Sequence, residues 1–187
     1  NNKSMGDGKM KTIKIKSSWR KLVVFDFDKT LADTEESVLI RDNKSDRVVD
    51  HLKSQAELDS YILNPEKHYY DFTEFNSVSK YAEPISETIS LMKKFISEEE
   101  TKVIVLTARH NESRHAISDF LSDQGVDTSE VYVRGTSGAK LKTGYLQKLL
   151  NRFNIRESVL IFEDSVENIR RYIALEYENP DLSFDYV

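Results

Sequence analysis

Two aspartates, Asp26 and Asp28, follow an apolar run of strand-forming residues and are separated by a single residue. Because side chains alternate between the two faces of a strand, this spacing places both carboxylates on one face. Thr107 follows a second apolar run, and Glu163 and Asp164 follow a later one. Oxygen ligands of this kind are those that a hard divalent cation prefers.

The elements that would position these side chains alternate between strand and helix. Apolar runs typical of strands buried in a parallel sheet occupy 21–27, 102–106, 130–133 and 158–162. Apolar residues at helical spacing indicate helices over 84–96, 116–121, 141–153 and 166–173. We therefore predict an α/β fold, a Rossmann-like parallel sheet with helices on both faces. The carboxyl ends of parallel strands meet at one edge of the sheet, so the polar residues after the strands should converge there.

Residues 33–82 break this alternation and are predicted to form a small cap inserted after the first strand. Within them, a hairpin is expected around the polar turn 43–45, followed by a helix whose Ser54 and Glu57 have capping-box spacing. The aromatic cluster over 68–75 fits packing of this cap better than stacking of nucleic-acid bases. The complete division is a basic, flexible leader over 1–20, a core over 21–32 plus 83–177, the cap over 33–82 and a C-terminal tail over 178–187.

The composition excludes several kinds of chemistry. With no cysteine among its 187 residues, the chain has no thiolate zinc site and no cysteine nucleophile, and its six glycines never take the spacing of a nucleotide-binding loop. No apolar run is long enough to span a bilayer, and the first twenty residues lack the apolar stretch of a signal peptide. We expect a cytoplasmic protein with no membrane partner. The net charge is −5, yet the segment 134–156 is basic and contains no acid, which suits an anionic ligand.

Four carboxylates predicted at one sheet edge would repel one another unless a cation lies between them. An all-oxygen ligand set favours Mg²⁺ over zinc. The predicted metal ligands are Asp26, Asp28, Glu163 and Asp164.

Three short segments, in order, resemble motifs of the haloacid dehalogenase superfamily. Residues 23–31, VVFDFDKTL, resemble its first motif, and residues 106–109, LTAR, resemble its second. Residues 161–165, IFEDS, resemble its fourth. The second motif is also similar to that of the phosphatase half of phage polynucleotide kinase-phosphatases, and the whole chain is similar to uncharacterised phage-encoded members of the superfamily.

The resemblance implies roles for individual residues. Asp26 would be the nucleophile that forms an aspartyl-phosphate, and Asp28 the acid that protonates the leaving oxygen. Thr107 would bind a phosphoryl oxygen, and Asp164 the metal. Glu163 would either ligate Mg²⁺ directly or hold a metal-bound water.

The remaining motif is a single lysine that neutralises nucleophile and phosphate. Lys142 fits because it begins a helical pattern, whereas spacing back from Glu163 favours Lys140, and both stay candidates. Thr30 and Arg109 are expected to contact substrate.

The function that the resemblance implies is Mg²⁺-dependent hydrolysis of a phosphomonoester, with a small phosphorylated metabolite or nucleotide as substrate. Three alternatives remain: a polynucleotide 3′-phosphatase acting on nucleic-acid ends, a phosphotransferase or mutase, and a non-catalytic phosphate-binding module. A basic site mouth would suit nucleic-acid ends, but phosphatases of small anions are basic there as well.

Overall fold

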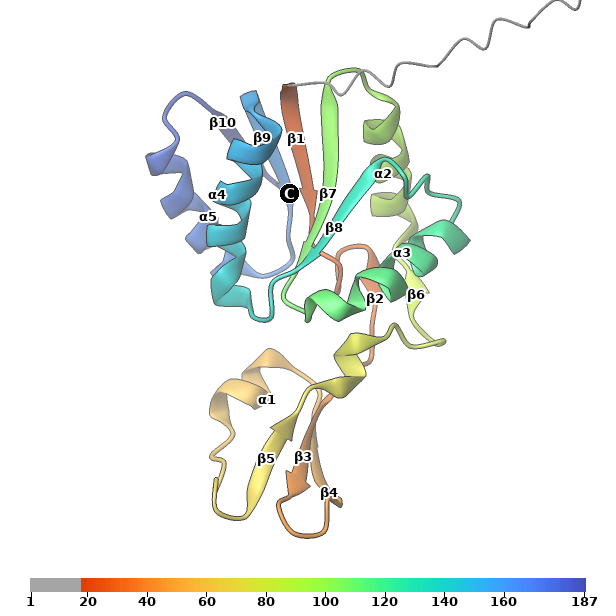
Figure 1. Cartoon of the computed structure of the whole chain (residues 1–187), viewed down its shortest axis with the longest axis vertical. Coiled ribbons are helices and arrows are strands. Elements are labelled where there is room, and N and C mark those ends of the chain that lie inside the picture. Colours follow the sequence, from red (N-terminus) through yellow and green to blue (C-terminus); the bar gives the residue numbers. More distant parts are fainter. Residues whose placement is uncertain (1–17) are drawn as a thin grey trace, which may run out of the picture.

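The computed structural model describes residues 18–187, and its core is a parallel sheet of five strands (Figure 1). The spatial order is β10-β9-β1-β7-β8. The strands are β1 (Trp19–Phe25), β7 (Thr101–Thr107), β8 (Val131–Gly135), β9 (Ile155–Phe162) and β10 (Ser183–Tyr186). Every neighbouring pair in this sheet runs parallel, which confirms the predicted α/β, Rossmann-like architecture.

Helices cover both faces of this sheet, and alternate residues of each strand pack against opposite layers. Val23 and Phe25 face α2 (Ser86–Ser97) and α3 (Arg114–Asp123), while Leu22 and Val24 face α4 (Lys142–Phe153) and α5 (Val166–Glu178). Burial on both sides explains why the central strands are apolar throughout. Pro84, expected to open the helix over 84–96, instead lies two residues before α2.

The cap is a three-stranded antiparallel sheet with one short helix, and it projects from the carboxyl edge of the core sheet (Figure 1). It comprises β3 (Val38–Asp42), β4 (Val48–Leu52), α1 (Gln55–Ser60) and β5 (His68–Asp71). The Ser54 side chain caps α1 by accepting a hydrogen bond from the amide of Glu57, as the spacing suggested. Two linkers join cap to core, and they pair through β2 (Ala32–Asp33) and β6 (Glu83–Pro84).

Part of the aromatic cluster is a strand that the sequence pattern did not indicate. β5 pairs antiparallel with β3, and Tyr70 and Phe75 pack against the small apolar core of the cap. Tyr69 and Phe72 are more exposed. Packing therefore accounts for part of the cluster.

The two ends of the chain differ from expectation. Residues 1–17 of the predicted leader lie outside the described residues, and its Trp19 and Arg20 begin β1. The predicted tail 178–187 contains β10, the edge strand of the core sheet, so these residues belong to the core.

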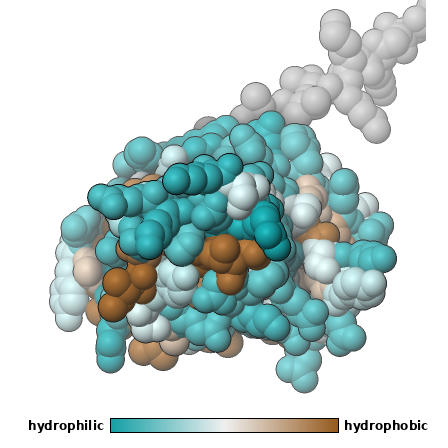
Figure 2. Space-filling model, turned by 90° about the horizontal axis from the view of Figure 1, so that it is seen from below, coloured by the Kyte–Doolittle hydropathy of each residue, from teal (hydrophilic) through white to brown (hydrophobic). Residues whose placement is uncertain are grey.

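Within 18–187, no helix has the length and apolar character of a membrane span. Seen from the cap end, the surface is mostly hydrophilic with separate apolar patches (Figure 2).

Candidate active site

Three carboxylates converge where β1 and β9 end. Asp26 directly follows β1, Glu163 and Asp164 directly follow β9, and the amide of Asp26 donates a 2.9 Å hydrogen bond to the carbonyl of Phe162. One oxygen of each of these three side chains lies within 4.8 Å of the others, close enough to share one ion. The convergence follows from the parallel pairing of β1 and β9, which brings both carboxyl ends to one edge.

Lys142 is the lysine that reaches this group. It is the first residue of α4, and its ammonium nitrogen lies 2.9 Å from Asp26 Oδ1 and 2.8 Å from Glu163 Oε2. Although its side chain is long and charged, only 1% of the residue is exposed. Lys140, the other candidate, is exposed on the preceding turn η3 (Ala139–Leu141). A buried cation between two carboxylates compensates part of their mutual repulsion.

Burial shifts the pKa values of this group. Loss of water around the carboxylate is the main cause that raises the pKa of Asp26 to about 8, and the positive charge of Lys142 opposes the shift. Burial is the largest single influence on Lys142 and disfavours its charged form, but the charges of Asp26, Tyr172 and Glu163 together outweigh it and raise the pKa of the ammonium. Desolvation also raises the pKa of Asp164, with the charge of Glu163 as the next cause.

The Glu163 carboxylate accepts more hydrogen bonds than the Asp26 carboxylate does. Its Oε2 accepts from Lys142, and its Oε1 accepts from the amide of Ser165 and the side-chain amide of Asn168, both at 3.2 Å. By contrast, Asp26 Oδ1 is buried and accepts no well-aligned hydrogen bond from the described residues, although Lys142 is close. Asp26 Oδ1 is thus compensated mainly by the charge of Lys142, and Asp164 is exposed at the same edge of the sheet. Asn168 was not identified from the sequence, where it is one more polar residue in a helix.

Asp28 lies apart from the group that could share an ion, contrary to the ligand set expected from the sequence. Its carboxylate accepts from Thr34 Oγ1 at 2.7 Å and from Arg109 Nη2 at 2.7 Å and Nε at 3.0 Å. The strand alternation after β1 does not continue, because Asp28 begins a tight turn that returns to Ala32.

Thr107 and Thr30 are both buried near the strand ends. Thr107 ends β7, and its hydroxyl oxygen accepts from the amide of Arg109 at 3.2 Å. The carbonyl of Thr30 accepts from the hydroxyl of Thr88 in α2, which ties the turn after β1 to that helix. Thr107 is thus placed at the same sheet edge as Asp26, whereas Thr30 helps to hold the turn after β1.

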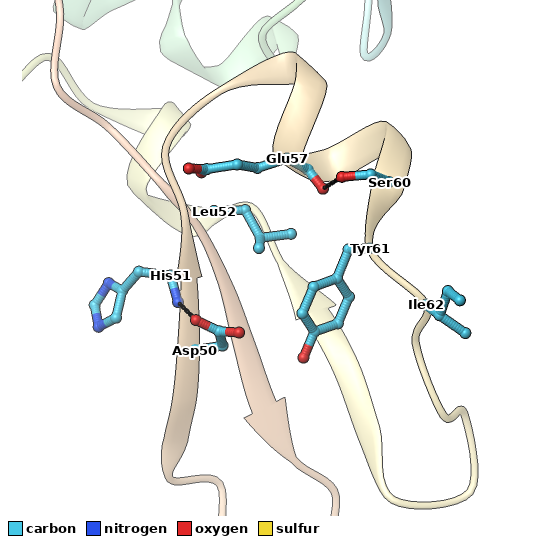
Figure 3. A pocket seen from close by; sticks show the side chains of 7 residues that line it. All are labelled: Asp50, His51, Leu52, Glu57, Ser60, Tyr61 and Ile62. Carbon is cyan, nitrogen blue, oxygen red and sulfur yellow. Dashed lines mark hydrogen bonds between the residues drawn. The ribbon is translucent and has the colours of Figure 1, made fainter.

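A cavity of about 520 Å³ lies elsewhere, within the cap between β4 and the segment around α1 (Figure 3). Its lining includes His51, Glu57, Tyr61 and Ile62, none of which was predicted as a site residue. A second cavity of about 270 Å³ lies between the cap linkers and is lined by Glu35, Glu36, Glu74, Ser77 and Ser79.

Comparisons of the chain with models of protein families, with curated proteins and with solved structures find no match. The site is therefore interpreted from its own geometry and chemistry.

Proposed function

We propose that this protein is a Mg²⁺-dependent phosphomonoester hydrolase that works through an aspartyl-phosphate, as the resemblance to the haloacid dehalogenase superfamily implies. The observation that carries the proposal is the position of Lys142, whose buried ammonium lies 2.9 Å from Asp26. A carboxylate beside a buried cation and further acidic oxygens suits the handling of a phosphoryl group, because the transferring charge must be neutralised.

The acidic oxygens fit a hard cation. Asp26 and Asp164 would hold Mg²⁺, since their oxygens are close together and Asp26 Oδ1 lacks a well-aligned hydrogen-bond donor among the described residues. Both oxygens of Glu163 already accept hydrogen bonds, which favours an indirect role for this residue through Lys142. When bound, Mg²⁺ would neutralise charge on the phosphoryl oxygens.

The protein groups would divide the reaction into two steps. A carboxylate oxygen of Asp26 would form a bond to phosphorus while the ester bond to the leaving oxygen breaks, and Asp28 would supply the proton to that oxygen. Water would then form a bond to phosphorus while the bond between phosphorus and Asp26 breaks, and the proton that the water loses would return to Asp28 as inorganic phosphate is released. Lys142 would neutralise charge on Asp26 and the phosphoryl group throughout, and Thr107 would contact a phosphoryl oxygen.

Replacement of Asp26 tests this proposal. The Asp26→Asn protein should lose at least about 10³-fold in turnover of an aryl phosphate with Mg²⁺, because the amide is a poor nucleophile. Asp185→Asn is the matched control, since Asp185 is exposed on β10. Undiminished phosphate release by Asp26→Asn, or equal release with and without chelator, would contradict the proposal. Free phosphate as product, rather than an isomerised sugar phosphate, would separate a hydrolase from a mutase.

One observation favours phosphorylated nucleic-acid ends as a second candidate substrate class. Arg134 and Lys148 lie over the ring of Tyr145, at 4.5 and 5.0 Å, and Arg152 lies over Tyr132 at 5.1 Å. These cations belong to β8 and α4, and α4 begins at Lys142, so a polyanion bound along them would lead toward the site. An assay that compares nucleoside monophosphates, sugar phosphates and oligonucleotides phosphorylated at the 3′ or 5′ end decides between the classes. Without a preference for 3′-phosphorylated ends, this candidate fails.

A further inference from the structure

Arg109 connects the core to both linkers of the cap. It follows β7, and only 1% of its side chain is exposed. On the core side, its Nε and Nη2 donate to the carboxylate of Asp28. The guanidinium carbon also lies 5.2 Å from the ring centre of Phe27. The cation is therefore fixed on one side by the residues that follow β1.

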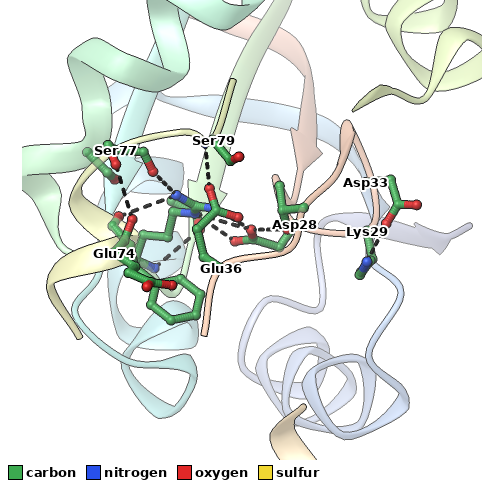
Figure 4. A network of polar contacts seen from close by, with 12 residues as sticks. Asp28, Lys29, Asp33, Glu36, Glu74, Ser77 and Ser79 are labelled. Atoms are coloured by element: carbon green, nitrogen blue, oxygen red, sulfur yellow. Dashed lines mark hydrogen bonds and ion pairs between the residues drawn. The ribbon is translucent and has the colours of Figure 1, made fainter. Parts of the chain in front are cut away.

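On the cap side, the same guanidinium contacts Glu36 of the outgoing linker and Ser77 of the returning linker, and both of these residues are labelled in Figure 4. Its Nη2 lies 3.1 Å from Glu36 Oε1, and its Nη1 donates to the carbonyls of Phe75 and Ser77. Arginine has five N–H donors, and these contacts provide an acceptor for each. Arg109 was expected to contact substrate, but in this arrangement its donors are already engaged.

Glu36 is unusual for an acidic residue in a linker. Only 4% of its side chain is exposed, and its Oε1 accepts from the amide of Ser79 at 2.9 Å in addition to its contact with Arg109. Its Oε2 is buried and has no partner among the described residues. Burying a carboxylate with an unsatisfied oxygen costs free energy, so Glu36 is poorly explained as a packing residue.

We infer that Glu36 is a positioning residue for the proposed reaction: it fixes the guanidinium of Arg109, and Arg109 fixes the carboxylate of Asp28. Thr34, on the same linker as Glu36, donates to Asp28 as well. The cap linkers thereby set the orientation of the group that would protonate the leaving oxygen. This inference rests on the proposed function, and it assigns Arg109 to Asp28 rather than to the substrate phosphate.

The dependence of rate on the leaving group tests this role. A nitrophenolate departs without a proton, whereas a simple alkoxide needs one, so a misplaced acid slows only esters of the second kind. In Glu36→Ala, we expect kcat for alkyl phosphates to fall by about 10-fold or more, and kcat for p-nitrophenyl phosphate by less than about 3-fold. A residue that only supports the fold would lower both rates equally.

Two further variants complete the experiment. Glu35→Ala is the matched control, because Glu35 is the exposed neighbour of Glu36 on the same linker, and its two rates should equal those of the unmodified protein. Glu36→Gln keeps the side-chain shape and the oxygen that meets both the amide of Ser79 and Arg109, but it removes the negative charge. It should show a smaller loss of the same selective kind, which keeps the test available where the alanine variant is unfolded. Circular dichroism and urea unfolding establish that each variant is folded.

Each result bears on one of the two proposals. Equal losses for both ester types, or no loss, would overturn the role of Glu36 while leaving the hydrolase proposal in place. An equal rise of KM for both esters in Glu36→Ala would also overturn it, because it would indicate that Arg109 binds the phosphate. Failure of the hydrolase proposal is recognised separately, by activity that survives Asp26→Asn.

Discussion

Lys142 and Arg109 are both buried cations, and each contacts two carboxylates. Lys142 contacts Asp26 and Glu163, and Arg109 contacts Asp28 and Glu36. The first cluster lies within the core, where β1, β9 and α4 meet, while the second joins the core to the cap linkers. The same arrangement, one cation between two acidic side chains, therefore occurs twice with different consequences.

The two clusters differ in how each cation contacts its acidic partners. The ammonium of Lys142 is a compact charge that leaves Asp26 Oδ1 without a well-aligned hydrogen bond among the described residues. The planar guanidinium of Arg109 engages a fixed set of acceptors in several directions. A carboxylate oxygen compensated only by a nearby charge can take a new ligand, whereas a guanidinium with an acceptor for each of its donors holds geometry. The Lys142 cluster thus suits chemistry and the Arg109 cluster suits positioning.

Replacing either buried cation should have the largest effect on the free energy of unfolding. Lys142→Met leaves Asp26 and Glu163 buried with no cation between them, and it should lower the free energy of unfolding by about 3–5 kcal/mol. Arg109→Met should have a smaller cost, about 2–4 kcal/mol, because 28% of the Asp28 side chain is exposed to water. Urea unfolding measures both.

Magnesium should distinguish the two variants. It should recover part of the stability of Lys142→Met, since the oxygens of Asp26, Glu163 and Asp164 can share one ion. It should stabilise Arg109→Met only as much as it stabilises the unmodified protein, because Asp28 and Glu36 are not in that group. Equal recovery would contradict the distinction drawn between the clusters. Lys140→Met, at an exposed position, should change stability by less than about 0.5 kcal/mol.

The Lys142 cluster could be anticipated from the sequence because its parts follow regular elements. Asp26, Glu163 and Asp164 come directly after strands, and the carboxyl ends of parallel strands meet. Helical periodicity also favoured Lys142, which begins α4, although spacing from Glu163 pointed equally to Lys140. Local pattern and topology together were sufficient for the three carboxylates, whereas the choice between the two lysines required the structure.

The Arg109 cluster could not be anticipated in the same way. Glu36 lies in a linker without periodic pattern, and its contact with Arg109 depends on the path of the chain through the cap.

Tertiary contacts also explain why two strands were not predicted from the sequence. β5 is defined by its pairing with β3, and β10 is a short edge strand in which Phe184 is buried. The alternation of Leu182, Phe184 and Tyr186 was a usable signal for β10.

One glycine lies near the backbone of each cation: Gly135 is close to the backbone of Arg109, and Gly144 lies in α4, the helix that begins at Lys142. A Cβ on Gly135 would lie 2.5 Å from the carbonyl group of His110 and 2.6 Å from the carbonyl oxygen of Arg109. Gly135→Ala must therefore displace the segment that carries Arg109, at a cost of about 1–3 kcal/mol. A Cβ on Gly144, within α4, would meet nothing within 4 Å. Gly144→Ala should stabilise the protein by about 0.5–1 kcal/mol through helix propensity. Urea unfolding of both variants measures the contrast, and effects of the same sign would show that the Arg109 segment is not tightly held.

The smallest expected effect is a change with pH in how much Mg²⁺ stabilises the folded protein. Burial raises the pKa of Asp26 to about 8, above the usual unfolded value of about 3.9. Between these two values the folded state without metal binds more protons than the unfolded state, so this group lowers stability as pH rises. Mg²⁺ must displace the proton from Asp26, and its affinity should therefore increase with pH until about 8.

Thermal unfolding with about 10 mM Mg²⁺ and with chelator tests this expectation at about pH 6 and about pH 8. The first pH lies below the pKa of Asp26 and the second lies near it. The stabilisation by Mg²⁺ should be larger at pH 8 by about 1 kcal/mol, or roughly 2–4 °C in Tm for a chain of this size. Asp26→Asn carries no proton to displace, and its response to Mg²⁺ should be small and the same at both pH values. Arg109→Met should keep the full pH-dependent response, because its cluster does not share the ion. A pH-independent Mg²⁺ effect in the unmodified protein would show that the ion binds without engaging Asp26.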